Sequence, residues 1–218
     1  MLLRVALASL ASLVLAAAAL ADATDPKERF SKAGQTLAAG TVLRGSDLGP
    51  GWQGGTRQPT SLKAPKCPAY SPNDSDLTLT GHAESLFSNG NGGVQVDNDV
   101  EIFKTKAQAA RRFARIVQPK IGTCLRYDLL KSLGGSGVLI EGAKRLAFAR
   151  VAAHTAVFRV PLDVKSGGQA VTVYSDFVFL NQGVTQIYLN VVAPSSLKGQ
   201  LAALELRLAR TLAGRAGH

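Results

Sequence analysis

The chain has 218 residues, of which 46% are hydrophobic and 18% are charged. This balance is typical of a globular protein and excludes an intrinsically disordered chain, and the length is enough for one domain with a substantial core. The formal net charge of +10 at pH 7 favours anionic partners, although it carries no information about the fold.

Residues 1–21 have the features of a secretory signal peptide. A single arginine precedes a long apolar stretch, and Ala19 and Ala21 occupy the −3 and −1 positions of a small-residue cleavage site before Asp22. We therefore expect a secreted chain that begins at Asp22. The alternative is an uncleaved anchor with the domain outside the membrane, because the apolar stretch approaches the length of a membrane span.

The sequence contains two cysteines, Cys67 and Cys124. An even number of cysteines in a secreted chain favours a disulfide, because the compartments outside the cytosol are oxidising. We expect a bond between these two residues, with two buried free thiols as the alternative.

Residues 22–40 are polar at first and then rich in alanine and glycine, which predicts a loosely attached segment with a short helix over residues 26–37. Residues 41–214 form the predicted domain. It opens with a helical turn capped by Ser46, and a long loop rich in proline follows over residues 57–76.

A β-hairpin is the clearest local signal in the N-terminal half. Residues 77–87 alternate between apolar and polar side chains, and a turn sequence rich in asparagine and glycine follows over residues 88–93. In the first strand we expect Leu79 and Phe87 on the apolar face and His82 on the polar face.

Thr105 is the expected N-cap of an amphipathic helix, and Gln108 completes a capping box. The apolar stripe of this helix includes Phe113 and extends past Pro119 to Cys124, so we expect a kink at the proline rather than a stop. This facing places Phe113 and Cys124 on the buried side.

Three strands are predicted in the C-terminal half, over residues 146–162, 170–180 and 184–192, with a break in the first. A final helix follows, capped by Ser195 or Ser196, and its leucines form a buried stripe. Each half thus has a β-β-α plan. The predicted fold is α+β: one twisted antiparallel sheet with two long amphipathic helices packed on one face.

The sequence lacks the patterns that common catalytic and metal sites need. The three histidines, His82, His154 and His218, are far apart in the sequence, which argues against a zinc site. The Gly-Gly-Ser-Gly segment at 134–137 lacks the spacing of a nucleophile elbow, and residues 90–93 lack the last glycine of a dinucleotide-binding loop. We therefore expect no catalytic residue, metal or cofactor.

The most basic stretch covers residues 102–127, which contain no acidic residue. Arg111, Arg112 and Arg115 are expected on the face opposite Phe113, where they could contact anionic lipid or wall polymers. Nucleic acid is disfavoured, because no aromatic residues interleave to stack bases. The alternative is an ordinary solvated helix face.

A ligand cleft is the other candidate site. Trp52, Tyr70, Tyr127 and Tyr174 are aromatic side chains with a polar atom, and together they could line such a cleft. The alternative is that they cover the edges of the core.

The order of several short motifs resembles a known family. Trp52 lies in an opening turn, a Cys-Pro loop and a Thr-Gly strand ending in Ser-x-Phe follow, and residues 100–113 read Val-Glu-Ile-Phe-Lys-Thr-Lys-Ala-Gln-Ala-Ala-Arg-Arg-Phe. This order resembles the PknH-like extracellular sensor domains, in particular the free-standing secreted type of actinobacteria without a kinase domain. The resemblance implies a twisted antiparallel sheet flanked by helices, a cleft for an unidentified ligand, and a match of Cys67 and Cys124 to the first disulfide of the family.

We therefore expect a secreted, non-catalytic ligand-binding or sensor-like domain of the cell envelope or extracellular space. Its expected partner is an unknown small molecule or an envelope component. The alternatives are a hydrolase that acts on envelope material and a scaffold protein held to lipid or wall polymer by charge.

Overall fold

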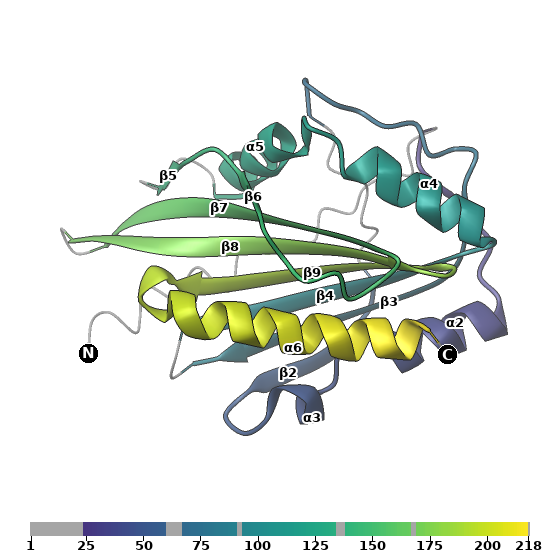
Figure 1. The fold of residues 1–218 in the computed structure, drawn as a ribbon, viewed down its shortest axis with the longest axis horizontal. Coiled ribbons are helices and arrows are strands. Elements are labelled where there is room, and N and C mark those ends of the chain that lie inside the picture. The colour runs from purple at the N-terminus through teal and green to yellow at the C-terminus, as the bar shows by residue number, and fades with distance from the viewer. Residues whose placement is uncertain (1–23, 60–66, 91–92, 134–137, 167–168, 218) are drawn as a thin grey trace.

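A computed structural model of the chain describes residues 24–59, 67–90, 93–133, 138–166 and 169–217 (Figure 1). The predicted signal peptide, its cleavage site before Asp22 and the Gly-Gly-Ser-Gly segment lie outside the described residues. Among the helices that are described, none is both long and apolar enough to cross a membrane.

The fold is α+β, as predicted, and its centre is one open, mixed sheet. The strands are β1 (Lys27–Glu28), β2 (Gln53–Arg57), β3 (Thr78–Asn89), β4 (Val94–Phe103), β5 (Val138–Ile140), β6 (Lys144–Leu146), β7 (His154–Ser166), β8 (Gln169–Gln182) and β9 (Thr185–Pro194). They follow the order β1-β3-β4-β9-β8-β7-β5, while β2 also pairs with β3 and β6 with β7. The β1–β3 pair is parallel, and the other pairs are antiparallel.

Helices cover both faces of the sheet, which corrects the expectation that the two long helices share one face (Figure 1). The helices are α2 (Lys32–Thr41), α3 (Gly45–Leu48), α4 (Lys106–Ile116), α5 (Ile121–Leu133) and α6 (Lys198–Ala216). Successive side chains of a strand point to opposite faces. In β8, Val178 and Leu180 accordingly pack in the core under α2 and α6, whereas Phe177 and Phe179 pack in the core under α4 and α5.

The predicted hairpin is confirmed as β3 and β4, but its first strand changes face near its start. The register with β4 shifts between Leu79 and Gly81, which is the effect of a β-bulge. Leu79 therefore packs against Ala109 on the α4 side, whereas Phe87 belongs to the core on the α6 side. The expectation that Leu79 and Phe87 share a face is wrong for this reason.

The helix after the hairpin begins as predicted and ends earlier. The Thr105 hydroxyl accepts a hydrogen bond from the Gln108 N–H, but the Gln108 side chain accepts from the Thr78 N–H instead of completing the capping box. Helix α4 ends at Ile116, and α5 begins beyond Pro119. The proline thus separates two helices, because it disfavours helical backbone in the residue before it.

The other helix boundaries move by several residues. The N-terminal helix begins at Lys32 after an N-cap at Ser31, and the turn that Ser46 was expected to cap has Arg44 as its N-cap. A short 3-10 turn, η1 (Ser195–Leu197), precedes α6, so neither of its serines caps that helix. The predicted break in the first C-terminal strand is confirmed as the gap between β6 and β7.

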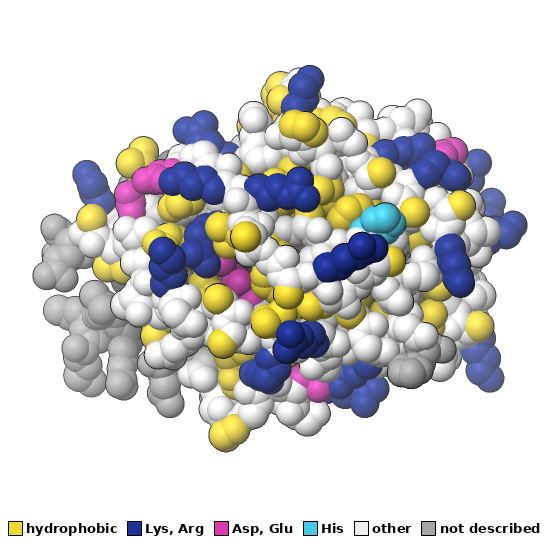
Figure 2. Space-filling model, viewed as in Figure 1, with side chains coloured by type: hydrophobic (Ala, Val, Ile, Leu, Met, Phe, Trp, Pro, Cys, Tyr) yellow, Lys and Arg dark blue, Asp and Glu magenta, His cyan; other side chains and the backbone are white. Residues whose placement is uncertain are grey.

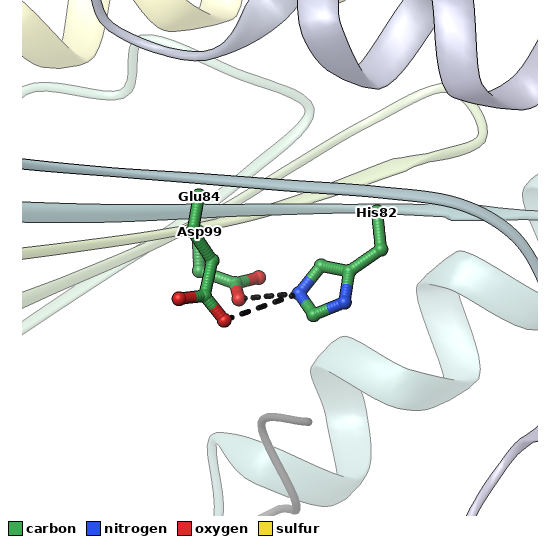
Figure 3. A group of neighbouring side chains, drawn as sticks. All are labelled: His82, Glu84 and Asp99. Atoms are coloured by element: carbon green, nitrogen blue, oxygen red, sulfur yellow. Dashed lines mark hydrogen bonds and ion pairs between the residues drawn. The ribbon is translucent and has the colours of Figure 1, made fainter. Parts of the chain in front are cut away.

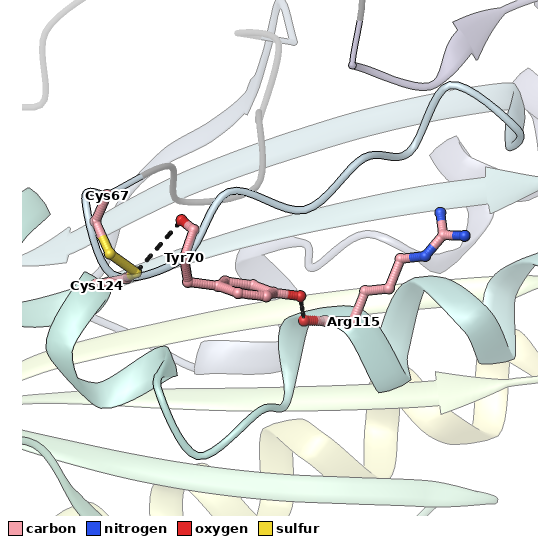
Figure 4. Close-up of a disulfide and its surroundings, with 4 residues drawn as sticks. All are labelled: Cys67, Tyr70, Arg115 and Cys124. Atoms are coloured by element: carbon pink, nitrogen blue, oxygen red, sulfur yellow. Dashed lines mark hydrogen bonds between the residues drawn. A yellow bond between two sulfur atoms is a disulfide. The ribbon is translucent and has the colours of Figure 1, made fainter.

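A disulfide joins Cys67 in the loop before β3 to Cys124 in α5, with a Cα–Cα distance of 5.3 Å, and confirms the predicted pair (Figure 4). Beside it, the Tyr70 hydroxyl donates a hydrogen bond to the Arg115 carbonyl, and the Tyr70 carbonyl oxygen lies 3.8 Å from the Cys124 sulfur. Because the crosslink closes a long loop, chain-entropy reasoning gives it about 4 kcal/mol of stability.

Helix α2 lies so close to β3 that two glycines meet at the contact. A Cβ atom on Gly34 would lie 2.2 Å from the Thr80 carbonyl oxygen, and one on Gly81 would lie 2.1 Å from the Gly34 carbonyl oxygen. No side chain fits at either position, so these glycines set the distance between the helix and the sheet.

We expect Gly34→Ala to lower the free energy of unfolding by about 2 kcal/mol or more, because the new methyl group collides with strand backbone. Gly40→Ala in the same helix is the matched control, since a Cβ atom added at Gly40 would meet nothing within 4 Å. That change should be neutral or stabilise by about 0.5–1 kcal/mol. Urea unfolding of both variants provides the test, and equal effects would show that α2 does not pack this closely.

Candidate functional site under helix α4

Charged side chains line the face of the β3–β4 hairpin that α4 covers. The hairpin register pairs Glu84 with Asp99 and His82 with Glu101, so these four side chains lie on one face. They are all buried, with exposed fractions of 7% for His82, 0% for Glu84, 2% for Asp99 and 5% for Glu101. The polar face of β3 that we predicted is thus real, but it is covered rather than solvated.

His82 lies at the centre of this group and contacts two carboxylates (Figure 3). Its Nε2 lies 2.6 Å from Asp99 Oδ2 and 3.7 Å from Glu84 Oε1. Burial by itself lowers the pKa of His82, but the hydrogen bond and negative charge of Asp99 outweigh burial and raise the pKa to about 9. Burial raises the pKa of Asp99 in turn. We refer to His82, Glu84 and Asp99 as the hairpin triad.

Arg57 on β2 neutralises the neighbouring carboxylates. Its Nε donates to Glu84 Oε2 at 2.8 Å, and its Nη2 lies 3.2 Å from both carboxylate oxygens of Asp97. Burial raises the pKa of Asp97 to about 6, although the charge of Arg57 acts in the opposite direction. Arg57 therefore holds Glu84 in a fixed orientation beside His82.

The α4 arginines form ion pairs instead of a free basic surface. Arg112 is 2% exposed and contacts both Glu101, at 3.3 Å, and Asp74. Arg115 reaches Asp74 at 3.1 Å and Asp76 at 2.6 Å, and Arg111 lies 3.4 Å from Asp76. The expectation that these three arginines contact anionic surfaces is wrong for Arg112, because the side chain is buried. Arg111 and Arg115 pair with Asp74 and Asp76, two acids of the loop before β3.

The expected aromatic cleft does not form in the described part of the chain. Trp52 and Tyr174 pack at the edge of the core on the α6 side, and Tyr70 packs on the α4 and α5 side. Tyr127 is 40% exposed. The sheet therefore separates Trp52 and Tyr174 from Tyr70. Tyr174 instead stacks with Arg159, whose guanidinium carbon lies 4.3 Å from the ring centroid.

A second buried charged group lies under α6. Arg159 Nε donates to Asp176 Oδ1 at 2.7 Å, and Glu205 of α6 is 1% exposed beside them. Burial, reinforced by hydrogen bonding to Asp176, raises the pKa of Glu205 to about 9. This raised pKa keeps the Glu205 carboxyl group neutral at pH 7, beside the carboxylate of Asp176. The face of the molecule seen in Figure 2, which includes α6 and also α4 and α5, carries Lys and Arg side chains across most of its width.

No protein-family model matches the chain, and no curated protein matches it. Among solved structures, it is similar to the extracellular domain of PknH from Mycobacterium tuberculosis, with 11% sequence identity and a TM-score of 0.45, over 80% of this chain and 95% of that one. A likeness at this level assigns neither a family nor a function. The resemblance in the order of motifs therefore remains a resemblance.

Removal of the buried Arg112 should destabilise the fold strongly. Arg112→Ala leaves Asp74 and Glu101 as buried charges without this partner, and breaking such a pair costs about 3–5 kcal/mol. Arg111→Ala, one residue away on an exposed ion pair, should change the free energy of unfolding by less than about 1 kcal/mol. Similar losses in the two variants, measured by urea unfolding, would contradict this facing of α4.

Glu205 should make stability fall as pH rises. Its pKa in the folded protein is raised to about 9 from the ordinary value of 4.5, so the folded state binds more protons than the unfolded state between these values. The contribution is fully present below pH 4.5 and is lost towards pH 9, with a slope that approaches about 1.4 kcal/mol per pH unit.

Glu205→Gln keeps a donor for Asp176 and removes the titration, so its stability should be flatter with pH and higher than that of the wild type at pH 8. Glu141→Gln changes an exposed carboxylate and is the control. Unfolding free energies at several pH values provide the test, and parallel wild-type and Glu205→Gln profiles would exclude a raised pKa at this residue.

Proposed function

We propose that this protein is a non-catalytic ligand-binding, sensor-like domain that acts outside the cytosol. The observation that carries the proposal is the buried hairpin triad. A fold of this size could complete its sheet with apolar residues, which stabilise at least as well as buried ion pairs. Buried titratable groups held by specific partners are therefore candidates for a functional site.

The disulfide supports the location. The Cys67–Cys124 bond ties the loop before β3 to α5, and such bonds persist in oxidising compartments and are rare in the cytosol. Together with the signal peptide predicted for residues 1–21, this favours a domain that is exported.

Binding is favoured over hydrolysis because of how the histidines lie. A hydrolase needs a nucleophile and a base within reach of substrate. His82 is buried, and Asp99 contacts its Nε2. His154 is exposed, and its ring contacts Phe113 at a centroid distance of 5.3 Å. The contacts described for these two histidines are thus with carboxylates and an aromatic ring, and none of these is a serine, threonine or cysteine nucleophile.

The alternative function, a scaffold protein held to lipid or wall polymer by charge, depended on a basic face of α4. Asp74 and Asp76 pair with the α4 arginines, so this helix does not present a uniformly basic face. The overall positive charge of the chain remains and can still concentrate the protein near anionic envelopes.

Native mass spectrometry of the secreted protein tests the proposal. We expect an additional mass that stays bound under native conditions and is absent from Asp99→Asn, while the exposed-site control Glu141→Gln retains it. We also expect no turnover above a blank on esters, peptides and glycans. Turnover that His154→Ala abolishes would instead establish the hydrolase, and a protein without any bound mass would contradict ligand binding.

A further inference from the structure

We propose that the hairpin triad is a binding site for one divalent first-row metal ion such as Zn²⁺. This inference rests on the proposed function and names the class of ligand. The three donor residues are His82 and Glu84 on β3 and Asp99 on β4, and their side chains project to the same side of the hairpin (Figure 3).

The distances fit a shared metal ligand sphere. One ligand atom from each of the three residues lies within 4.8 Å of the other two. His82 Nε2 is 2.6 Å from Asp99 Oδ2 and 3.7 Å from Glu84 Oε1. Donor atoms that bind Zn²⁺ at about 2.0–2.2 Å in a tetrahedron lie about 3.3 Å apart. Small side-chain rotations are therefore enough to place a cation among the three donors.

The backbone beneath these donors is firmly held. Glu84 and Asp99 are paired across the β3–β4 ladder, and β3 also pairs with β2 over this stretch. The backbone N–H of His82 donates to the Gln35 side chain of α2 at 3.0 Å. Arg57 fixes Glu84 through its second carboxylate oxygen, Oε2. Such outer partners orient metal ligands and are a usual part of metal sites.

The charges around the triad favour a cation. Four carboxylates lie on this face of the hairpin, from Glu84, Asp97, Asp99 and Glu101, and the cationic partners described for them are Arg57, Arg112 and His82. Arg112 is in addition shared with Asp74. When His82 binds a metal ion through Nε2 it releases its proton, so the ion takes the place of the imidazolium charge beside Glu84 and Asp99.

The donor set selects the class of metal. One imidazole nitrogen with two carboxylates suits zinc and its neighbours in the first transition row, whereas calcium and magnesium prefer oxygen ligands alone. Zinc ranks above manganese and iron in affinity for such mixed sites. Burial of the triad also restricts the ligand to a small one, which agrees with a single ion.

The test is a Zn²⁺ titration of the complete secreted protein, with its disulfide intact and after treatment with a chelator, against a chromophoric competitor. We expect one equivalent to bind, and we expect Asp99→Asn and His82→Gln each to weaken binding at least about 10-fold. A variant in which His154 and His218 are both replaced by glutamine is the matched control and should retain wild-type affinity. Substitution with Co²⁺ should give visible absorption from the bound ion, lost in His82→Gln.

Circular dichroism and thermal unfolding show whether each variant is folded. Should Asp99→Asn not fold, Glu84→Gln is the second variant, with the same expected loss of affinity. Folded triad variants that bind Zn²⁺ as tightly as the wild type, or a wild type that binds none, would overturn the metal site. If native mass spectrometry then still detects an organic ligand, the metal inference fails while the proposed binding function stands; if it detects no bound mass, both fail.

Discussion

The antiparallel ladder between β3 and β4 determines the side of the sheet on which the neighbouring side chains lie. Once Glu84 pairs with Asp99, the alternation of the strands places the hairpin carboxylates under α4 and the valines of β4 under α6. The bulge between Leu79 and Gly81 completes this arrangement, because it returns Leu79 to the α4 side and leaves a glycine where α2 approaches most closely. The positions of α2 and α4 both depend on this one register.

Each face of the sheet buries a charged group beside an apolar core. Under α4, Arg112 joins the hairpin to the loop that contains Asp74, so a charge that sequence patterning would place in solvent holds three segments together. Under α6, Arg159 and Asp176 are joined by a carboxyl group from the helix itself, Glu205. Buried groups of this kind add little net stability but are satisfied by few alternative packings. They therefore favour one arrangement of helices over the others that apolar contacts allow.

The sequence was sufficient for the elements with strong local signals. Four predicted features depend on local chemistry or on elimination, and each is present in the structure: the β3–β4 hairpin, the Thr105 cap, the long C-terminal strands and the cysteine pair. The facing of α4 was not predictable in this way, because hydrophobic periodicity assigns every arginine to solvent. The partners of Arg112 come from a loop and a strand distant in the sequence. The bulge near Gly81 likewise depends on packing against α2.

The hairpin triad could be predicted from the sequence only in part. His82 and Glu84 lie close together on one strand, but Asp99 comes 17 residues after His82, so a search for closely spaced histidines and cysteines misses the group. Continuing the ladder from Asn89 and Val94 at the predicted turn, however, brings Glu84 opposite Asp99 and places His82 two residues away on the same face. The signal was thus present in the hairpin register, although burial of the group by α4 required the structure.

The outer strands of the sheet have a consequence for self-association of the protein. The long strands β3 and β7 lie next to the edges, and each is covered by two short pieces, β1 with β2 and β5 with β6. Strand β1 has 2 residues and β5 has 3, so no long row of unpaired backbone groups faces outward along the described edges. Short edge strands give another chain little on which to extend the sheet. This arrangement protects the protein from edge-to-edge aggregation.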